Sequence, residues 1–121
     1  MGDLRAVWPR TIQAVSVATI KWNKKARHEF VEHINYARQE FGVTTAFKWY
    51  AAKNNIERQV SMYPESFPLE PLMRHKHRIY RRAVLIKNFK IVYVYYPSSD
   101  TVRIVDIWDT RMNPETLKQR L

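Results

Sequence analysis

The segment from Arg78 to Ile86 is a predicted β-strand in which neither face is purely polar. Its β-branched and aromatic side chains alternate with arginine, and successive side chains of a strand point to opposite faces of the sheet. One face carries Ile79, Arg81, Ala83 and Leu85, and the other carries Tyr80, Arg82, Val84 and Ile86. Apolar side chains on both faces require both faces of the sheet to be at least partly covered. We expect helices on one face and a partner chain or nucleic acid on the other.

The same part of the chain carries most of the net positive charge. The sequence has 21 Lys or Arg and 11 Asp or Glu, which gives a net charge of +10. The range from Pro71 to Pro97 has no acidic residue and seven basic ones, Arg74, Lys76, Arg78, Arg81, Arg82, Lys87 and Lys90. Such a localised charge predicts a surface that binds an anion, either nucleic acid or an acidic protein. The alternative is a solvated basic face that only keeps the protein monomeric.

Length and composition exclude several classes of protein. A chain of 121 residues, of which 45% are hydrophobic and 13% aromatic, predicts one folded domain over residues 1–121. With no cysteine there is no disulfide framework, and this is typical of a reducing cytoplasm. No apolar run is long enough for a membrane helix or a signal peptide, so we expect a cytoplasmic protein without membrane contact.

We also expect no cofactor and no metal site. The only glycines are Gly2 and Gly42, which excludes the glycine-rich phosphate loops of nucleotide-binding proteins. His28 and His33 are five residues apart on a predicted helix, whereas two metal ligands on one helix face are three or four apart.

The first half of the chain predicts a strand followed by two helices. Residues 13–22 are rich in β-branched side chains and fit a strand that ends at Trp22. Asn23 is a candidate N-cap for the first helix, Gly42 a candidate C-cap, and Thr44 or Thr45 a candidate N-cap for the second helix. The short connection makes the helices an antiparallel hairpin. Their apolar stripes are Ala26, Phe30, Ile34, Ala37 and Phe41 in the first helix and Trp49, Ala52, Ile56, Val60 and Tyr63 in the second.

The second half predicts an antiparallel meander. Residues 64–77 contain three prolines and predict an ordered surface loop, followed by strands at 78–86, 89–96 and 101–108. In the basic tail, residues 110–121, Asn113 and Pro114 are suited to begin a short helix. The predicted class is therefore α+β, with a strand, a helical hairpin and a three-stranded meander, and with helices packed on one sheet face. Residues 1–13 are an extension without an assigned role.

The order of the elements and three short motifs resemble a known family. The motifs are Trp22-Asn-Lys-Lys-Ala26, Arg82-x4-Lys-Asn-Phe89-Lys-Ile-Val-Tyr93, and Val105-Asp-Ile-Trp108-Asp-Thr-Arg111. Over residues 14–121 the chain resembles the RelE/ParE toxin superfamily of bacterial type II toxin-antitoxin systems. The resemblance implies that the protein is such a toxin, with the fold described above.

The family includes two activities. RelE-like members cut mRNA in the ribosomal A site, and ParE-like members poison DNA gyrase. By position, the basic residues that RelE-like members use fall on Arg81, Lys90 and Arg111, whereas Ala83 and Leu117 stand where those members have a lysine and a tyrosine. We expect a ribosome-dependent mRNA interferase. The alternatives are a ParE-like gyrase inhibitor without nuclease activity and a non-toxic basic nucleic-acid-binding module.

RNA cleavage defines what chemistry these residues would have to perform. A base must deprotonate a 2′-OH, a cation must stabilise the phosphorane, and an acid must protonate the leaving oxygen. Arg81, Lys90 and Arg111 are suited to hold the phosphate. The candidates for acid and base are His75, His77 and Asp109. The alternative for these three is two loop histidines in solvent and a carboxylate that pairs with Arg111.

Further side chains are predicted to contact the substrate. These are Arg78, Arg82, Lys87, His75, His77 and Trp108. Tyr96 and Trp108 lie near strand ends, where aromatic rings are able to stack on bases, whereas Phe89 and Tyr93 fit the core of the sheet better.

The resemblance also implies a protein partner, a cognate antitoxin that wraps the toxin and silences it. An acidic, partly disordered segment that folds across a basic, half-apolar sheet gains both charge pairing and buried area. The second partner is the target itself, which is mRNA on the ribosome or DNA gyrase.

Overall fold

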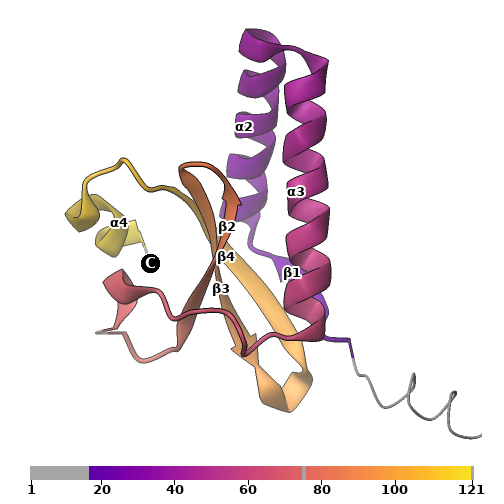
Figure 1. Ribbon diagram of the computed structural model, residues 1–121. Helices are drawn as coiled ribbons and strands as arrows, with labels where there is room; N and C mark the ends of the chain where they lie inside the picture. The colour runs from indigo at the N-terminus through magenta and orange to yellow at the C-terminus, as the bar shows by residue number, and fades with distance from the viewer. Residues whose placement is uncertain (1–16, 75, 121) are drawn as a thin grey trace, which may run out of the picture.

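The computed structural model describes residues 17–74 and 76–120, which form a four-stranded sheet and a long helical hairpin (Figure 1). The elements in chain order are β1 (Thr19–Trp22), α2 (Lys24–Phe41), α3 (Val43–Met62), the 3-10 turn η1 (Pro71–Met73), β2 (Tyr80–Ile86), β3 (Phe89–Tyr96), the 3-10 turn η2 (Pro97–Ser99), β4 (Thr101–Asp109) and α4 (Pro114–Arg120). This confirms the predicted α+β order. The first strand ends at Trp22 as predicted, but it begins at Thr19, so residues 17 and 18 of the predicted strand are not part of it. Residues 13–16 and the 1–13 extension lie outside the described residues.

The sheet has the strand order β1-β4-β3-β2. Strands β2, β3 and β4 form the predicted antiparallel meander. The two-residue turn between β2 and β3 has Lys87 at a positive φ of 42°, a backbone conformation that suits the twist of a tight hairpin. The first strand adds to the sheet on the other side, parallel to β4, with Thr19 opposite Thr101. The first and last strands along the described chain, β1 and β4, are therefore neighbours in the sheet.

Gly42 alone separates the two helices of the hairpin. Its φ of 93° lies in a region that few other residues adopt, and its N–H donates to the carbonyl of Arg38 at 3.0 Å. The predicted C-cap is confirmed. The predicted N-cap of the second helix is wrong, because α3 begins directly at Val43 and Gly42 also serves as its N-cap.

Asn23 occupies the predicted N-cap position of α2, but its side chain makes no capping hydrogen bond. Its Oδ1 accepts a hydrogen bond from Arg103 Nη1 at 3.1 Å instead, so it ties the start of α2 to β4. Asn113 does cap as predicted, since its Oδ1 accepts from the N–H of Glu115 at 2.9 Å. Asn23 differs from Asn113 because a cationic donor on a neighbouring strand, Arg103, occupies the side-chain oxygen of Asn23.

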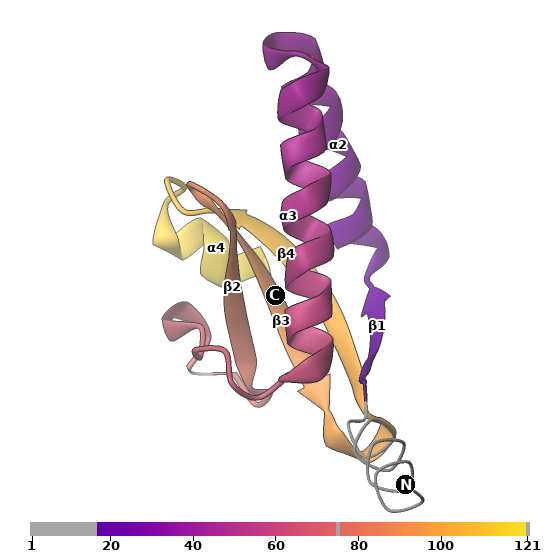
Figure 2. The ribbon, with the colours of Figure 1, turned by 45° about the vertical axis from the view of Figure 1, so that its right-hand side comes forward.

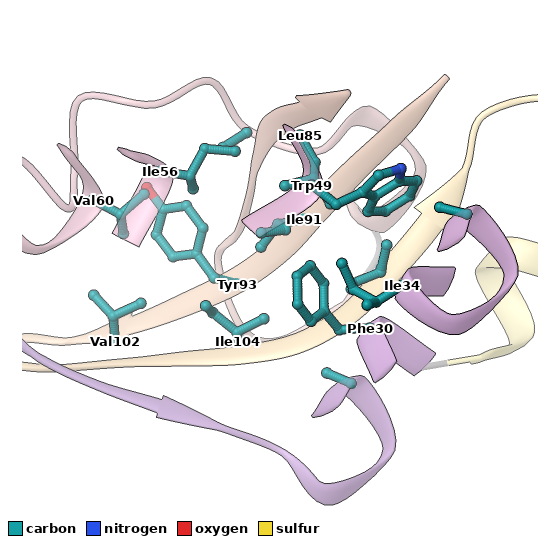
Figure 3. Close-up of a cluster of buried hydrophobic side chains, with 14 of the residues drawn as sticks. Phe30, Ile34, Trp49, Ile56, Val60, Leu85, Ile91, Tyr93, Val102 and Ile104 are labelled. Carbon is teal, nitrogen blue, oxygen red and sulfur yellow. The ribbon is translucent and has the colours of Figure 1, made fainter. Parts of the chain in front are cut away.

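The main core lies between the helical hairpin and one face of the sheet (Figure 3). It contains the predicted stripes of both helices, which pack on Ile91, Tyr93, Val102 and Ile104. Phe41 and Tyr63 are the exceptions, with 66% and 60% of their surface exposed. Phe41 lies at the tip of the hairpin, which rises beyond the end of the sheet (Figure 2), and Tyr63 follows the last turn of α3.

The opposite face of the sheet is covered by the chain itself. Turn η1 and helix α4 lie on this face (Figure 1) and enclose a second core of Met73, Val92, Val94, Val105, Trp108 and Leu117. The chain itself therefore shields most of the face for which a partner chain or nucleic acid was expected, and Val84 near the end of β2 stays 66% exposed. The tail that looked like a basic appendage supplies Leu117, which is 2% exposed and fills the place that an external partner was expected to take.

Candidate functional site

The loop before β2 is fixed along the outer edge of that strand. The carbonyl of Pro68 accepts from the N–H of Arg82 at 3.0 Å, and the N–H of Glu70 donates to the carbonyl of Tyr80 at 2.8 Å. These backbone hydrogen bonds satisfy the first part of the edge of β2, at Tyr80 and Arg82, which would otherwise be open to pairing with another strand. The loop thus supplies a rigid border to the basic part of the sheet.

Two of the predicted cations hold this loop in place. Arg81 Nη1 donates to the carbonyl of Phe67, and Arg82 Nη1 donates to the carbonyl of Leu69, both at 2.7 Å. Arg81 lies on the hairpin side of the sheet, two residues before buried Ala83. Both guanidinium groups therefore stabilise the position of the loop, and each retains further N–H donors for an anion.

Lys90 lies on the opposite side of the sheet and forms an ion pair with Glu70. The Glu70 side chain is fully buried, and that of Lys90 is only 13% exposed. The second oxygen of Glu70 accepts from the N–H of Leu72 at 3.0 Å, and the ammonium of Lys90 lies 5.3 Å from the centre of the Trp108 ring. The charge of Lys90 is thus neutralised within the protein by the carboxylate of Glu70.

Arg111 and Asp109 form a pair after the end of β4. Arg111 Nε and Nη2 donate to the two oxygens of Asp109 at 2.9 and 2.8 Å. The hydrogen bond from Arg111 lowers the pKa of Asp109, and the same hydrogen bond raises the pKa of Arg111. Asp109 is consequently ionised at neutral pH and is a weak base, which does not suit the acid or base role considered for it.

The remaining predicted contacts are dispersed. Arg78 lies over the ring of Tyr96, 5.9 Å from its centre, and together with His77 it lines a shallow hollow of about 170 Å³. Lys87 is exposed in the turn between β2 and β3, and His75 lies outside the described residues. The predicted contact role of Trp108 is wrong, since its ring is fully buried and its Nε1 donates to Asp106 at 2.9 Å.

Arg81, Lys90 and Arg111 do not converge on one point. Lys90 faces η1 and α4, whereas Arg81 belongs to the hairpin side of the sheet. Arg111 lies near Phe89, whereas Arg81 is opposite Tyr93 on the same strand, β3. Phe89 and Tyr93 are four residues apart, which corresponds to about 13 Å along a strand. A single phosphate clamp of these three side chains is not the arrangement of this structure.

The structure reveals a pocket that the sequence did not indicate. It lies between the outer half of the helical hairpin, the turn after β2 and the segment after β4, and it has a volume of about 350 Å³. Its lining consists of His33, Tyr36, Ala37, Phe41, Thr45, Trp49, Ile86, Lys87, Asn88, Phe89 and Arg111. We call it the aromatic pocket. The spacing of His33, Ala37 and Phe41 at four-residue steps was the available signal, but it resembles an ordinary apolar stripe.

His33 is a half-buried titratable group in the lining of the aromatic pocket. Its ring is stacked on Trp49, with 5.4 Å between the ring centres, and lies 4.7 Å from that of Phe89. Burial lowers the pKa of His33, although the nearby carboxylates of Glu29 and Asp109 act in the opposite direction. The imidazole is therefore neutral at neutral pH.

Acidification will destabilise the protein through His33. The unfolded chain binds this proton near pH 6.5, above the folded pKa, so the contribution of His33 is complete above pH 6.5 and is lost as the pH falls through this value. In urea denaturation between about pH 7.5 and pH 5, we expect His33→Gln to show a smaller loss of unfolding free energy than the wild type. His77→Gln, at an exposed position before β2, is the control and should follow the wild type. Parallel curves for His33→Gln and the wild type would contradict this assignment.

The described residues contain no group of three or more His, Asp or Glu side chains that could hold a metal ion. Within the same residues, no helix combines the length and the apolar character needed to cross a membrane.

Comparison with known proteins identifies the class of fold. No family model and no curated protein matches the sequence. Among solved structures, a chain of the chromosomal ParDE TA system from P. aeruginosa matches with a TM-score of 0.62 and 14% identity, over 78% of this chain and 98% of that chain. The chain therefore shares its fold with a chain of this ParDE TA system. The isolated E. coli RelE toxin matches over 86% of this chain and 99% of its own, at 16% identity, but its TM-score of 0.48 is too low to support an argument.

Proposed function

We propose that this protein is the toxin of a type II toxin-antitoxin system. The supporting observation is the fold that it shares with a chain of the ParDE TA system. The net charge of +10 and the basic segment around β2 and β3 are consistent with partners that are acidic or contain nucleic acid. The cognate antitoxin would be an acidic, partly disordered protein.

A ParE-like action, by binding DNA gyrase, fits the geometry better than RNA cleavage does. Lys90 is neutralised by Glu70, and Asp109 is held ionised by Arg111. Cleavage needs a phosphate clamp with an acid and a base within hydrogen-bonding reach, and the described candidates lie apart. Inhibition of gyrase by binding needs only a complementary surface, and exposed cations such as Arg78 and Lys87 provide one.

Expression of the protein alone should stop bacterial growth, because either kind of toxin blocks an essential process. We expect co-expression with an adjacent gene for a small acidic protein to restore growth. The measurement is a growth curve after induction from a repressed promoter, with an empty vector as the control. Normal growth at verified expression of folded protein would support the non-toxic nucleic-acid-binding alternative and would contradict our proposal.

Two assays with purified protein separate the possible targets. We expect it to inhibit the supercoiling of relaxed plasmid by gyrase and to create no new 5′ ends in a translated mRNA mapped by primer extension. E. coli RelE serves as the positive control for ribosome-dependent cuts. New cuts that require ribosomes, together with unaffected gyrase, would replace the gyrase proposal with an mRNA interferase.

A further inference from the structure

The aromatic pocket has the size of a small-molecule site and one rigid wall. Its volume of about 350 Å³ is within the range of ligand pockets, from about 300 to 1,000 Å³. Trp49 is only 7% exposed and is held between His33 and Phe89, with 4.9 Å between the Trp49 and Phe89 ring centres. Trp49 belongs to the main core and Phe89 packs against it, so this wall is supported by buried side chains.

The outer wall of the pocket is aromatic and exposed. Tyr36 and Phe41 have 59% and 66% of their surface exposed, and their rings meet edge to face with 6.2 Å between their centres. A planar ring that entered the pocket would cover these two side chains and approach Trp49 and Phe89. Stacking on aromatic side chains is a common way in which proteins bind a nucleobase.

The charged side chains that line the pocket are basic. Lys87 projects from the turn after β2, and Arg111 follows β4. The guanidinium of Arg111 lies 5.8 Å from the centre of the Phe89 ring and is oriented by its two hydrogen bonds to Asp109. These bonds use two of the five N–H donors of the guanidinium, so the others are available to an anion. The charge of Asp109 is balanced by Arg111, which leaves the charge of Lys87 in excess.

Asn88 adds an amide side chain to the lining of the pocket. An amide side chain both donates and accepts hydrogen bonds, as the edge of a base requires. The lining thus combines aromatic surfaces for the base, an amide for its polar edge and cations for the phosphate of a nucleotide.

We propose that the aromatic pocket binds a nucleoside 5′-phosphate, with the base beside Trp49 and Tyr36 and the phosphate at Arg111 and Lys87. The ligand is either a free mononucleotide or the terminal nucleotide of a single strand, since both present the same chemistry. Nucleotide binding is inferred only from the geometry and charge of the pocket and does not require the toxic activity proposed above, although Arg111 and Lys87 are also among the residues that the family resemblance suggested for the substrate.

Isothermal titration calorimetry tests this site with the four ribonucleoside 5′-monophosphates, adenosine, inorganic phosphate and a 5′-phosphorylated octathymidylate. We expect saturable binding of at least one phosphorylated probe at one site, and at least tenfold weaker binding of adenosine and of phosphate alone. Binding of the oligonucleotide without the mononucleotides would identify the end of a strand as the ligand. No binding of any phosphorylated probe at millimolar concentration, or equal binding of adenosine, would overturn the proposal.

Variants locate the binding. Arg111→Gln and Tyr36→Ser should each weaken it about tenfold, because they remove a phosphate contact and a stacking surface from exposed positions. Lys48→Gln and Phe47→Ser, an exposed cation and an exposed aromatic on α3 outside the pocket, are the matched controls and should bind as the wild type does. Circular dichroism verifies that each variant is folded. Unchanged affinity in Arg111→Gln and Tyr36→Ser would place the ligand elsewhere, and tighter binding of N-acetyltryptophan than of any nucleotide would assign the pocket to a protein side chain.

Discussion

Replacement of Asp106 by alanine will lower the free energy of unfolding by about 3–5 kcal/mol, which is typical of breaking a buried ion pair. Asp106 has no exposed surface, and its oxygens accept hydrogen bonds from Arg120 Nε and Nη2, both at 2.8 Å. It also accepts from Trp108 Nε1 and from the N–H of Ile107, both at 2.9 Å. The carboxylate thus joins β4 to α4 and to the buried ring of the second core, and alanine leaves all four donors without it.

Urea denaturation followed by circular dichroism at neutral pH measures this loss. A guanidinium is charged at neutral pH, so Arg120, whose side chain is only 20% exposed, keeps its charge when the carboxylate of Asp106 is removed. A second variant, Asp106→Ala with Arg120→Met, should therefore recover part of the stability. Glu40→Ala, at an exposed position of α2, is the control and should change stability by about 0.5 kcal/mol or less. A loss of less than about 1 kcal/mol for Asp106→Ala would contradict the central role of this carboxylate.

Removal of the buried carboxylate of Glu70 will have a comparable effect. Glu70→Ala leaves the ammonium of Lys90 without its partner at a site that is 13% exposed, and we expect a loss of about 3–5 kcal/mol. Glu70→Leu with Lys90→Met replaces both charges by apolar groups of similar size. Because such replacements are often neutral, the double variant should lie within about 1 kcal/mol of the wild type. The measurement is again urea denaturation, with Lys48→Met as the control at an exposed cation.

The same double variant tests what Lys90 does in the proposed toxin. If Lys90 only balances Glu70, the folded double variant still arrests growth when expressed alone. A folded double variant that has lost toxicity would show that the ammonium acts on the target, as the family resemblance first implied. The single variant Lys90→Met is less informative, because it leaves Glu70 buried without a cation.

The elements of the fold were predictable because each has a local signal. Apolar residues at three- and four-residue steps indicated both helices, and the alternation of Val, Ile and Tyr indicated β3 with its bounds correct. Gly42 marked the end of the first helix, since its backbone conformation is unfavourable for other residues. Propensity does not say which face of a sheet a short tail will cover, so the position of α4 was missed.

The fate of the charged residues was less predictable, because an ion pair joins residues that are distant in the sequence. Arg120 contacts Glu29 from the other end of the chain, and Lys90 meets Glu70 across the second face of the sheet. A count of charges shows how many cations a segment has, but not which of them are consumed by internal carboxylates. The place of His33 in the aromatic pocket was not predictable either, because Phe89 and Arg111 are distant from it in the sequence and reach it only through the tertiary fold.

The pairing of the first strand with the last has a consequence for how the protein is made. Thr19 meets Thr101, so β1 lacks its partner until 82 more residues have been synthesised. The main core includes Val102 and Ile104 of that same late strand, and it stays incomplete for as long. A pairing so distant in sequence closes late in folding. On the ribosome, therefore, neither the pairing of β1 nor the main core can be completed before β4 has been synthesised.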